Sequence, residues 1–150
     1  MRVIVLGADG YLGWPTSLHL SARGHEVIAA DNLIRRRWDV LCGTESLVPI
    51  ASMKRRVARW KAVSGKEIKW ERLDLTSLPD TTALITQYHP DAIVHFAEQR
   101  SAPYSMISGP HAVETQVNNV VGTLNLLFAM RESAPDAHLV KLGTMGEYGT

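Results

Sequence analysis

The sequence predicts an α/β fold, a doubly wound parallel sheet with five strands, and two observations support this prediction. Short apolar runs, several of them rich in β-branched residues, alternate five times with segments of helical periodicity. The first run ends in a turn that contains three glycines within seven residues. Parallel neighbouring strands need crossover connections, and helices on both faces of the sheet supply them.

Five runs are predicted to be strands. The first, RVIVL, ends at Gly7, and the second, EVIAA, stops at Asp31, as is typical of buried parallel strands. In chain order, the predicted strands cover residues 2–6, 26–30, 67–73, 91–97 and 138–142. The residues that follow parallel strands meet at one edge of the sheet, where open α/β sheets bind their ligands.

The helices predicted between these strands cover residues 12–22, 47–63, 77–88 and 113–132. Pro15 fits the first turn of the first helix, and Gly24 ends that helix. The second helix lies in a long excursion over residues 32–66, and we interpret its face of lysines and arginines as solvated. The last helix carries on one face Val120, Leu124, Leu127 and Phe128.

Composition excludes several classes of protein. Hydrophobic residues make up 45% and charged residues 21% of the chain, which is typical of a globular domain. No apolar run approaches the ~20 residues of a membrane span, and a net charge of +1 provides no basic field for nucleic acid. The N-terminus lacks a signal-peptide pattern, so we expect a cytoplasmic protein. The single cysteine, Cys42, fits a reducing compartment and is expected to be a small, partly buried hydrophobic residue.

The segment GADGYLG lies between a predicted strand and a predicted helix, as a dinucleotide-binding fingerprint requires. Gly7 permits the tight turn off the strand, Gly10 lets a pyrophosphate approach the backbone, and Gly13 lets the helix pack on the sheet. The free amides and the positive dipole end of that helix would hold the phosphates. Residues 1–150 are therefore predicted to form a Rossmann domain that binds NAD.

Asp31 lies at the end of the second predicted strand, 18 residues after Gly13. A carboxylate at this position accepts hydrogen bonds from the adenosine ribose hydroxyls and repels the 2′-phosphate of NADP, which favours NAD. Three arginines that follow leave NADP open, because an arginine can accommodate that phosphate. These are Arg35, Arg36 and Arg37.

Other residues have both a functional and a structural interpretation. Asp74 either accepts a hydrogen bond from the adenine amino group, with Leu75 against the ring, or caps the helix that follows Thr76. His95 lies in an apolar strand and is interpreted as a core residue with satisfied hydrogen bonds. No cluster of histidines, cysteines and carboxylates has metal-site spacing, so no metal is predicted.

The spacing Gly-x-x-Gly-x-x-Gly, followed by HFA (residues 95–97) and NVVGT (residues 119–123), resembles the extended short-chain dehydrogenase/reductase family. Members of this family are nucleotide-sugar epimerases and dehydratases with bound NAD. Further segments resemble the branch of the family that makes a sulfonated sugar nucleotide for sulfolipid synthesis. They are GADGYLGW, DNLIRR, TESLVPIAS, EQRSAPYSMI and VKLGTMGEYGT, and the resemblance covers essentially the whole chain.

The resemblance implies roles for individual residues. Tyr11 and Leu12 would contact the pyrophosphate, and Arg100 and Asn119 would line the nicotinamide half of the cofactor. Thr144 would hydrogen-bond the sugar 4-hydroxyl, as a catalytic and substrate-binding residue. Asp31, Asn32 and Arg36 would surround the adenosine ribose, and Ala97 is also expected to contact the cofactor.

Members of the family use a tyrosine base in a Tyr-x-x-x-Lys motif, which residues 1–150 do not contain. Tyr148 belongs to the TMGEYG segment and does not correspond to that base. We therefore expect an incomplete, inactive domain, with the C-terminal part of the fold and the sugar-binding part outside this chain. A full-length protein of this kind is expected to be a homodimer.

The implied substrates are UDP-glucose and sulfite. Hydride leaves C4 of the sugar for NAD, the C6 hydroxyl is eliminated, sulfite adds at C6, and hydride returns to C4. Gln99, Arg100 and Ser101 could hold the substrate or an anion; alternatively, Arg100 serves only the cofactor or a structural carboxylate.

Three alternatives remain for the function. A UDP-glucose 4-epimerase and a 4,6-dehydratase share the predicted fold, although a dehydratase normally has an acid directly after the catalytic threonine, where this chain has Met145. The third alternative is a regulator that binds NAD without catalysis.

Overall fold

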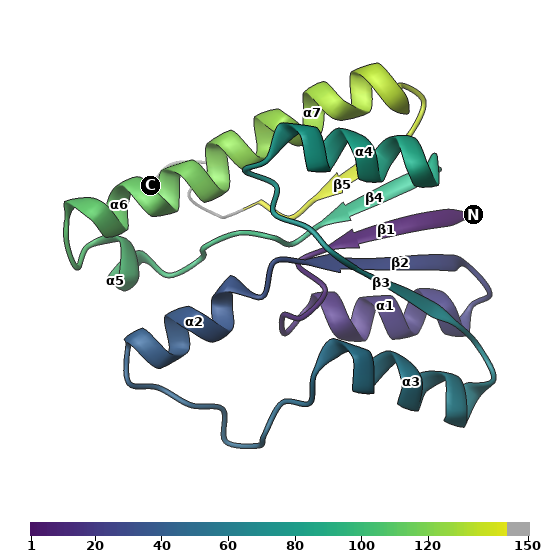
Figure 1. Cartoon of the computed structure of the whole chain (residues 1–150), viewed down its shortest axis with the longest axis horizontal. Helices are drawn as coiled ribbons and strands as arrows, with labels where there is room; N and C mark the ends of the chain where they lie inside the picture. Colours follow the sequence, from purple (N-terminus) through teal and green to yellow (C-terminus); the bar gives the residue numbers. More distant parts are fainter. Residues whose placement is uncertain (144–150) are drawn as a thin grey trace.

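The computed structural model describes residues 1–143, which form a five-stranded sheet with helices on both faces (Figure 1). All neighbouring strands are parallel, and their order across the sheet is β3-β2-β1-β4-β5. The strands are β1 (Arg2–Leu6), β2 (Glu26–Asp31), β3 (Ile68–Arg72), β4 (Ala92–His95) and β5 (His138–Lys141). The predicted doubly wound α/β fold is confirmed, and each predicted strand is correct to within about two residues at either end.

The strand order reverses at β1, which lies between β2 and β4. Leu6, the last residue of β1, is level with Ala30 of β2 and with His95 of β4. The loops that follow β1, β2 and β4 therefore begin side by side at the carboxyl edge of the sheet. An open α/β sheet leaves its ligand-binding crevice at such a reversal point.

The helices in chain order are α1 (Gly13–Ala22), α2 (Ile34–Leu41), α3 (Met53–Ser64), α4 (Leu78–Tyr88), α5 (Ala102–Ser105), α6 (Gly109–Gln116), η1 (Val117–Val121) and α7 (Gly122–Ser133). Helices α1 and α3 cover one face of the sheet, and α4 and α7 cover the other (Figure 1). Alternate residues of β1 pack against the helices on opposite faces of the sheet. Val3 and Val5 pack with the first pair of helices, and Ile4 and Leu6 with the second. Burial on both faces explains the continuous apolar run of β1.

The excursion between β2 and β3 differs from its prediction. It contains two helices, α2 and α3, joined by an exposed segment, where one helix over residues 47–63 was predicted. Helix α3 begins at Met53 because the Ser52 hydroxyl accepts a hydrogen bond of 3.4 Å from the Arg55 amide. Helix α2 was not predicted; it has eight residues, of which only Trp38 is buried.

The last predicted helix is longer than expected. Helices α6, η1 and α7 follow one another without interruption, and η1 is a π-helical turn. The buried residues of α7 include Leu126, Ala129 and Met130. Leu124 and Phe128, on the face that the sequence marked as apolar, are about half-exposed.

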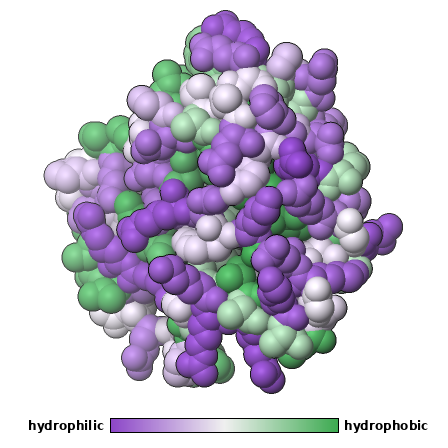
Figure 2. Space-filling model, turned by 45° about the vertical axis from the view of Figure 1, so that its right-hand side comes forward, coloured by the Kyte–Doolittle hydropathy of each residue, from purple (hydrophilic) through white to green (hydrophobic). Residues whose placement is uncertain are grey.

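Cys42 is exposed, so its predicted partial burial is wrong. It is the C-terminal cap of α2, where the chain turns into the exposed segment. The face of the molecule in Figure 2 is mostly hydrophilic, with small apolar groups between the polar side chains. In the part of the chain that the structure describes, no helix combines the length and the apolar character that crossing a membrane requires.

Candidate functional site

The glycine loop between β1 and α1 lies at the reversal point of the sheet. Gly7 has a φ of +78°, and a Cβ on it would lie 2.7 Å from the amide nitrogen of Ala97. A Cβ on Gly13 would lie 2.1 Å from the carbonyl oxygen of Gly7. Both positions therefore require glycine: the first for the turn against the loop after β4, the second because α1 begins directly against the loop backbone.

The start of α1 presents backbone donors at the carboxyl edge. The Gly10 amide donates to the Gly7 carbonyl oxygen at 3.1 Å, which closes a tight turn. Tyr11 and Leu12 are exposed, and among the described residues their amides have no backbone acceptor. These amides are therefore available to an anion at the positive end of the helix.

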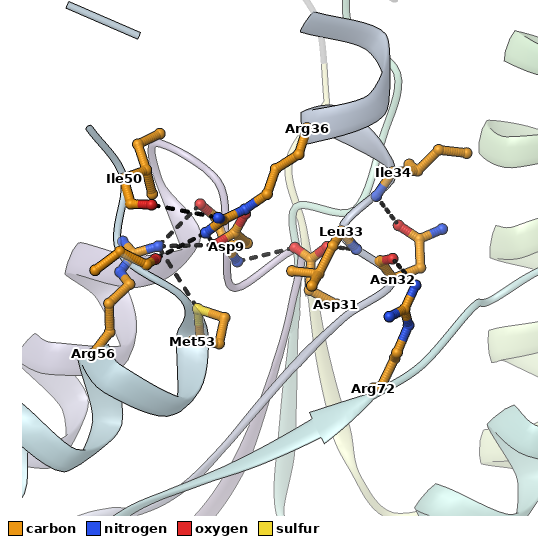
Figure 3. Close-up of polar contacts among 11 residues, drawn as sticks. Asp9, Asp31, Asn32, Leu33, Ile34, Arg36, Ile50, Met53, Arg56 and Arg72 are labelled. Carbon is orange, nitrogen blue, oxygen red and sulfur yellow. Dashed lines mark hydrogen bonds and ion pairs between the residues drawn. The ribbon is translucent and has the colours of Figure 1, made fainter. Parts of the chain in front are cut away.

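Asp31, at the end of β2, lies beside the glycine loop. Its Oδ2 accepts a hydrogen bond of 2.9 Å from the Asp9 amide, and its Oδ1 accepts one of 2.6 Å from the Leu33 amide (Figure 3). Burial raises the pKa of the Asp31 carboxyl above its usual value, although these two hydrogen bonds act in the opposite direction. Each carboxylate oxygen keeps a further lone pair for a ligand hydroxyl. The side chain of the neighbouring Asn32 accepts a hydrogen bond of 3.0 Å from the Ile34 amide.

Asp9, which lies within the glycine loop, is a site residue that the sequence analysis missed. Its side chain is only 6% exposed. Arg36 of α2 donates to both carboxylate oxygens, from Nε at 2.7 Å and from Nη2 at 2.8 Å (Figure 3). Arg56 of α3 donates from Nη1 to Oδ1 at 2.9 Å. Its signal in the sequence is limited to an acid at the third position of the glycine loop.

The two arginines bind the same buried acid. The guanidinium of Arg36 is bound to Asp9, and its expected place near the cofactor ribose stays a prediction. Arg56 belongs to the helix face interpreted as solvated, but its side chain is only 16% exposed. That interpretation is therefore wrong for Arg56, while Lys54 and Arg55 on the same helix are exposed.

A cavity opens between the glycine loop, the end of β2 and the start of the loop after β4. Its walls include several predicted cofactor residues: Gly7, Gly10, Asp31, Asn32, Leu75 and Ala97. Asn118 of η1 also lines it and donates a hydrogen bond of 3.4 Å to the Ala97 carbonyl oxygen. The structure therefore brings together residues of β1 and β2 and of the segments that follow β3 and β4, which are far apart in the sequence.

Asp74 has a local structural role. Its Oδ1 accepts hydrogen bonds from the Thr76 amide at 3.0 Å and from the Thr76 hydroxyl at 2.8 Å. The cap of α4 is Ser77, whose hydroxyl accepts a hydrogen bond of 3.4 Å from the Asp80 amide. The alternative that Asp74 caps this helix is therefore wrong, and its contact with adenine stays a prediction.

The polar segment after β4 is held by Asn119 of η1. The Asn119 side chain accepts from the Gln99 amide at 2.8 Å and donates to the Gln99 carbonyl oxygen at 2.9 Å. The buried Gln99 side chain in turn accepts from the Ser101 amide at 2.8 Å. Arg100, between them, is exposed. Asn119 thus fixes the backbone from which Arg100 projects.

A second cavity adjoins the first, and the two share Arg35, Trp38 and Glu98. Gln99, Arg100 and Ser101 line this second cavity. A group held there would lie next to a ligand in the first cavity.

His95 is the core residue that the sequence predicted. It is 1% exposed, its Nδ1 accepts a hydrogen bond of 3.1 Å from the Ala97 amide, and its Nε2 lies 3.4 Å from the Thr123 hydroxyl. Burial lowers the pKa of the His95 imidazole to about 4, so the ring is neutral at pH 7.

Thr144, the predicted catalytic residue, lies outside the described residues, as do Met145 and Tyr148. Between residues 1 and 143, no group of three or more histidine, cysteine, aspartate or glutamate side chains could hold a metal ion.

A five-stranded sheet in this order, with a glycine loop at its reversal point and an acid at the end of β2, defines a Rossmann-type domain. The chain belongs to the NAD dependent epimerase/dehydratase family, which matches residues 3–150.

Two relatives that share about half of their residues with this chain carry the name UDP-sulfoquinovose synthase. The chain is 52% identical over 149 residues to "UDP-sulfoquinovose synthase, chloroplastic" of Spinacia oleracea, a match that covers 99% of this chain and 31% of that protein. It is 50% identical over 150 residues to "UDP-sulfoquinovose synthase" of Sulfolobus acidocaldarius, covering 100% and 38%. A "UDP-glucose 4-epimerase" of Klebsiella pneumoniae is 31% identical over 131 residues, covering 87% and 81%. The chain thus spans about a third of the length of the first two relatives.

Solved structures agree with the fold. UDP-glucose-4-epimerase from Stenotrophomonas maltophila, with bound NAD and formylated UDP-arabinopyranose, has a TM-score of 0.74 and 26% identity, covering 99% of this chain and 38% of that one. The UDP-Glc/GlcNAc 4-epimerase from Campylobacter jejuni has a TM-score of 0.76 and 24% identity, with the same coverage.

Proposed function

We propose that the chain binds NAD in the cavity between the glycine loop and Asp31. The observation that carries this proposal is that Gly7 and Gly13, at the reversal point of the sheet, leave no room for a Cβ atom. The free amides of Tyr11 and Leu12 suit the pyrophosphate, and the Asp31 carboxylate suits the adenosine ribose hydroxyls. Leu75 offers an apolar wall for the adenine, with Asp74 beside it. The bound NAD of the Stenotrophomonas relative supports this proposal.

The nicotinamide half of the cofactor would extend toward the loop after β4. Ala97 lines the cavity at this end. Asn119 would act by holding the Gln99 backbone, so that Arg100 projects beside the cofactor.

We further propose that the whole protein makes UDP-sulfoquinovose from UDP-glucose and sulfite. Support comes from identity: about half of the residues match relatives of that name over the full chain, against 31% for the Klebsiella epimerase. Bound NAD would supply the hydride acceptor for C4 of the sugar. Thr144 would hydrogen-bond the 4-hydroxyl, and Arg100, with Gln99 and Ser101, would hold an anion such as sulfite in the second cavity.

Two experiments test these proposals separately. Calorimetric titration of the chain with NAD tests the cofactor site; absence of saturable binding by the folded chain would overturn it. The activity is tested in a chimera of this chain and the C-terminal part of the Sulfolobus relative, which begins where the 150-residue match ends. With UDP-glucose, the chimera is expected to form UDP-sulfoquinovose only when sulfite is present. Its Thr144→Ala variant is expected to lose turnover and keep NAD.

A UDP-glucose 4-epimerase is the second candidate, because the Klebsiella relative of that name matches this chain over 81% of its own length. It predicts that the chimera forms UDP-galactose from UDP-glucose without sulfite. Product analysis in the absence of sulfite therefore separates the two candidates.

Assembly and location complete the proposal. A homodimer is supported by the half-exposed apolar residues Val120, Leu124, Leu127 and Phe128 on η1 and α7. Sedimentation of the full-length protein tests it.

A reducing compartment such as the cytoplasm is supported by the single cysteine, although the spinach relative is named as chloroplastic.

A further inference from the structure

The carboxylate of Asp9 is the centre of a small ion cluster beside the cofactor cavity. Asp9 forms ion pairs with Arg36 at 2.7 Å and with Arg56 at 2.9 Å, and its side chain is almost completely buried. The three residues come from the glycine loop, α2 and α3 (Figure 3). We call these three residues the Asp9 cluster.

Every nitrogen of the Arg36 guanidinium donates a hydrogen bond to Asp9 or to a neighbouring backbone carbonyl. Nε and Nη2 bind the two oxygens of Asp9, and Nη2 also donates to the Ala51 carbonyl oxygen at 2.9 Å. The remaining nitrogen, Nη1, donates to the Ile50 carbonyl oxygen at 3.4 Å. Such a two-pronged pair with a carboxylate fixes the plane of the guanidinium. Arg36 therefore cannot turn toward a ligand without breaking several hydrogen bonds.

Arg56 is fixed from a second side. Its Nη1 binds both Oδ1 and the backbone oxygen of Asp9, and its guanidinium lies 4.5 Å from the centre of the Trp14 ring. Asp9 thus forms ion pairs with two arginines, one from each of the helices that follow β2.

Asp9 is also joined to the residue that is proposed to bind the ribose. Its amide donates a hydrogen bond to Oδ2 of Asp31, and both residues line the cavity. Together with Asp31, the cluster therefore contains two carboxylates and two arginines, so these four residues present no net positive charge to an additional phosphate.

We propose that Asp9 is a specificity-determining residue that selects NAD over NADP by keeping Arg36 away from the 2′-phosphate. This inference rests on the proposed binding of NAD beside Asp31. In the wild-type chain, a 2′-phosphate would meet the Asp31 carboxylate with Arg36 already paired. Neutralising Asp9 leaves Arg36 and Arg56 without their partner and next to the ribose, where a phosphate dianion can take its place.

The experiment is a calorimetric titration of the 150-residue chain with NAD and with NADP, for the wild type and for Asp9→Asn. Asparagine has the shape of aspartate but no charge. The ratio of the two dissociation constants is expected to move toward NADP by at least about tenfold. A purely structural role of Asp9 would weaken both cofactors equally, and an unchanged ratio would overturn the inference.

Two double variants identify the arginine. Arg36→Gln added to Asp9→Asn is expected to abolish the gain in NADP binding. Arg35→Gln added to Asp9→Asn removes the arginine that lines the cavity, and it is expected to leave the gain intact. The opposite result would assign the phosphate to Arg35 and contradict the role given to Arg36.

Arg56→Gln provides an independent test that keeps Asp9, should circular dichroism reveal that Asp9→Asn does not fold. It makes the cluster more negative, so NADP is expected to bind about threefold or more weakly relative to NAD. An unchanged ratio in folded Arg56→Gln would contradict the inference. Failure of the wild-type chain to bind NAD would overturn the proposed function instead, so the two failures are distinguishable.

Discussion

The backbone amide of Asp9 donates a hydrogen bond of 2.9 Å to Oδ2 of Asp31, and this bond joins the glycine loop to the end of β2. The two residues are 22 positions apart in the chain, and the parallel pairing of β1 with β2 brings them together. The turn proposed to bind the phosphates and the acid proposed to bind the ribose are therefore held in one arrangement. Preorganisation of this kind reduces the entropic cost of binding.

Substitution of Gly13 by alanine should abolish cofactor binding. The new Cβ would lie 2.1 Å from the Gly7 carbonyl oxygen, so the start of α1 must move away from the loop. We expect the variant to lose more than about 2 kcal/mol of unfolding free energy, measured in urea, and to show no saturable NAD binding.

Gly109→Ala is the matched control for that variant. Gly109 begins α6, and a Cβ there meets no atom within 4 Å. Its stability and NAD affinity should equal those of the wild type. Normal NAD binding by Gly13→Ala would mean that the glycine loop is not the phosphate site.

Acid should destabilise the fold through His95. Burial lowers the pKa of this imidazole to about 4, below its ordinary value of 6.5, so the unfolded chain binds a proton that the folded chain refuses. The contribution of His95 to the free energy of unfolding is fully present above pH 6.5. It is lost as the pH falls toward 4, by about 3 kcal/mol in total.

The check is a series of urea unfolding curves between pH 7.5 and 4, compared between the wild type, His95→Gln and the exposed His138→Gln. The pH dependence of His95→Gln should be shallower, because glutamine does not titrate. The curve of His138→Gln should run parallel to the wild type. Parallel curves for all three proteins would rule out His95 as the source.

Glu114 of α6 connects three helices, because its carboxylate accepts hydrogen bonds from Trp38 of α2, at 3.2 Å, and from the hydroxyl of Tyr104 of α5. Both aromatic residues are buried. Glu114→Ala leaves two buried donors without a partner and should cost about 2 kcal/mol of unfolding free energy. Glu114→Gln keeps an acceptor and should cost clearly less; equal losses would contradict this account of the contact.

Cys42 should react as an exposed thiol. The native chain is expected to release one equivalent of thionitrobenzoate from Ellman's reagent without denaturant, since the residue is exposed at the end of α2. Reaction only after unfolding would restore the partly buried cysteine that the sequence suggested. Cys42→Ser should leave the unfolding free energy unchanged within about 0.5 kcal/mol.

The strands and the glycine loop could be predicted because their signals are local. Each central strand is buried on both faces, which produces an uninterrupted apolar run such as RVIVL. Gly13 is required by the loop's own backbone, and Gly7 by its φ of +78° and by the loop after β4. The three glycines at fixed spacing are nevertheless visible in seven consecutive residues.

The Asp9 cluster and α2 could not be predicted because they depend on tertiary contacts. Arg36 and Arg56 reach Asp9 from positions 27 and 47 residues away, and nothing in their local sequence distinguishes them from solvated arginines. Helix α2 has eight residues and buries a single one, Trp38, whereas α4 buries four. The hydrogen bonds of Asn119 could not be predicted for the same reason, because its partner Gln99 lies 20 residues earlier.

The most direct test of the central claim is the calorimetric titration of the folded 150-residue chain with NAD and NADP at physiological salt. The account predicts saturable binding of one NAD per chain, at least about tenfold tighter than NADP, and its loss in Gly13→Ala. A folded wild-type chain that binds neither dinucleotide, or that binds both equally well, would contradict it.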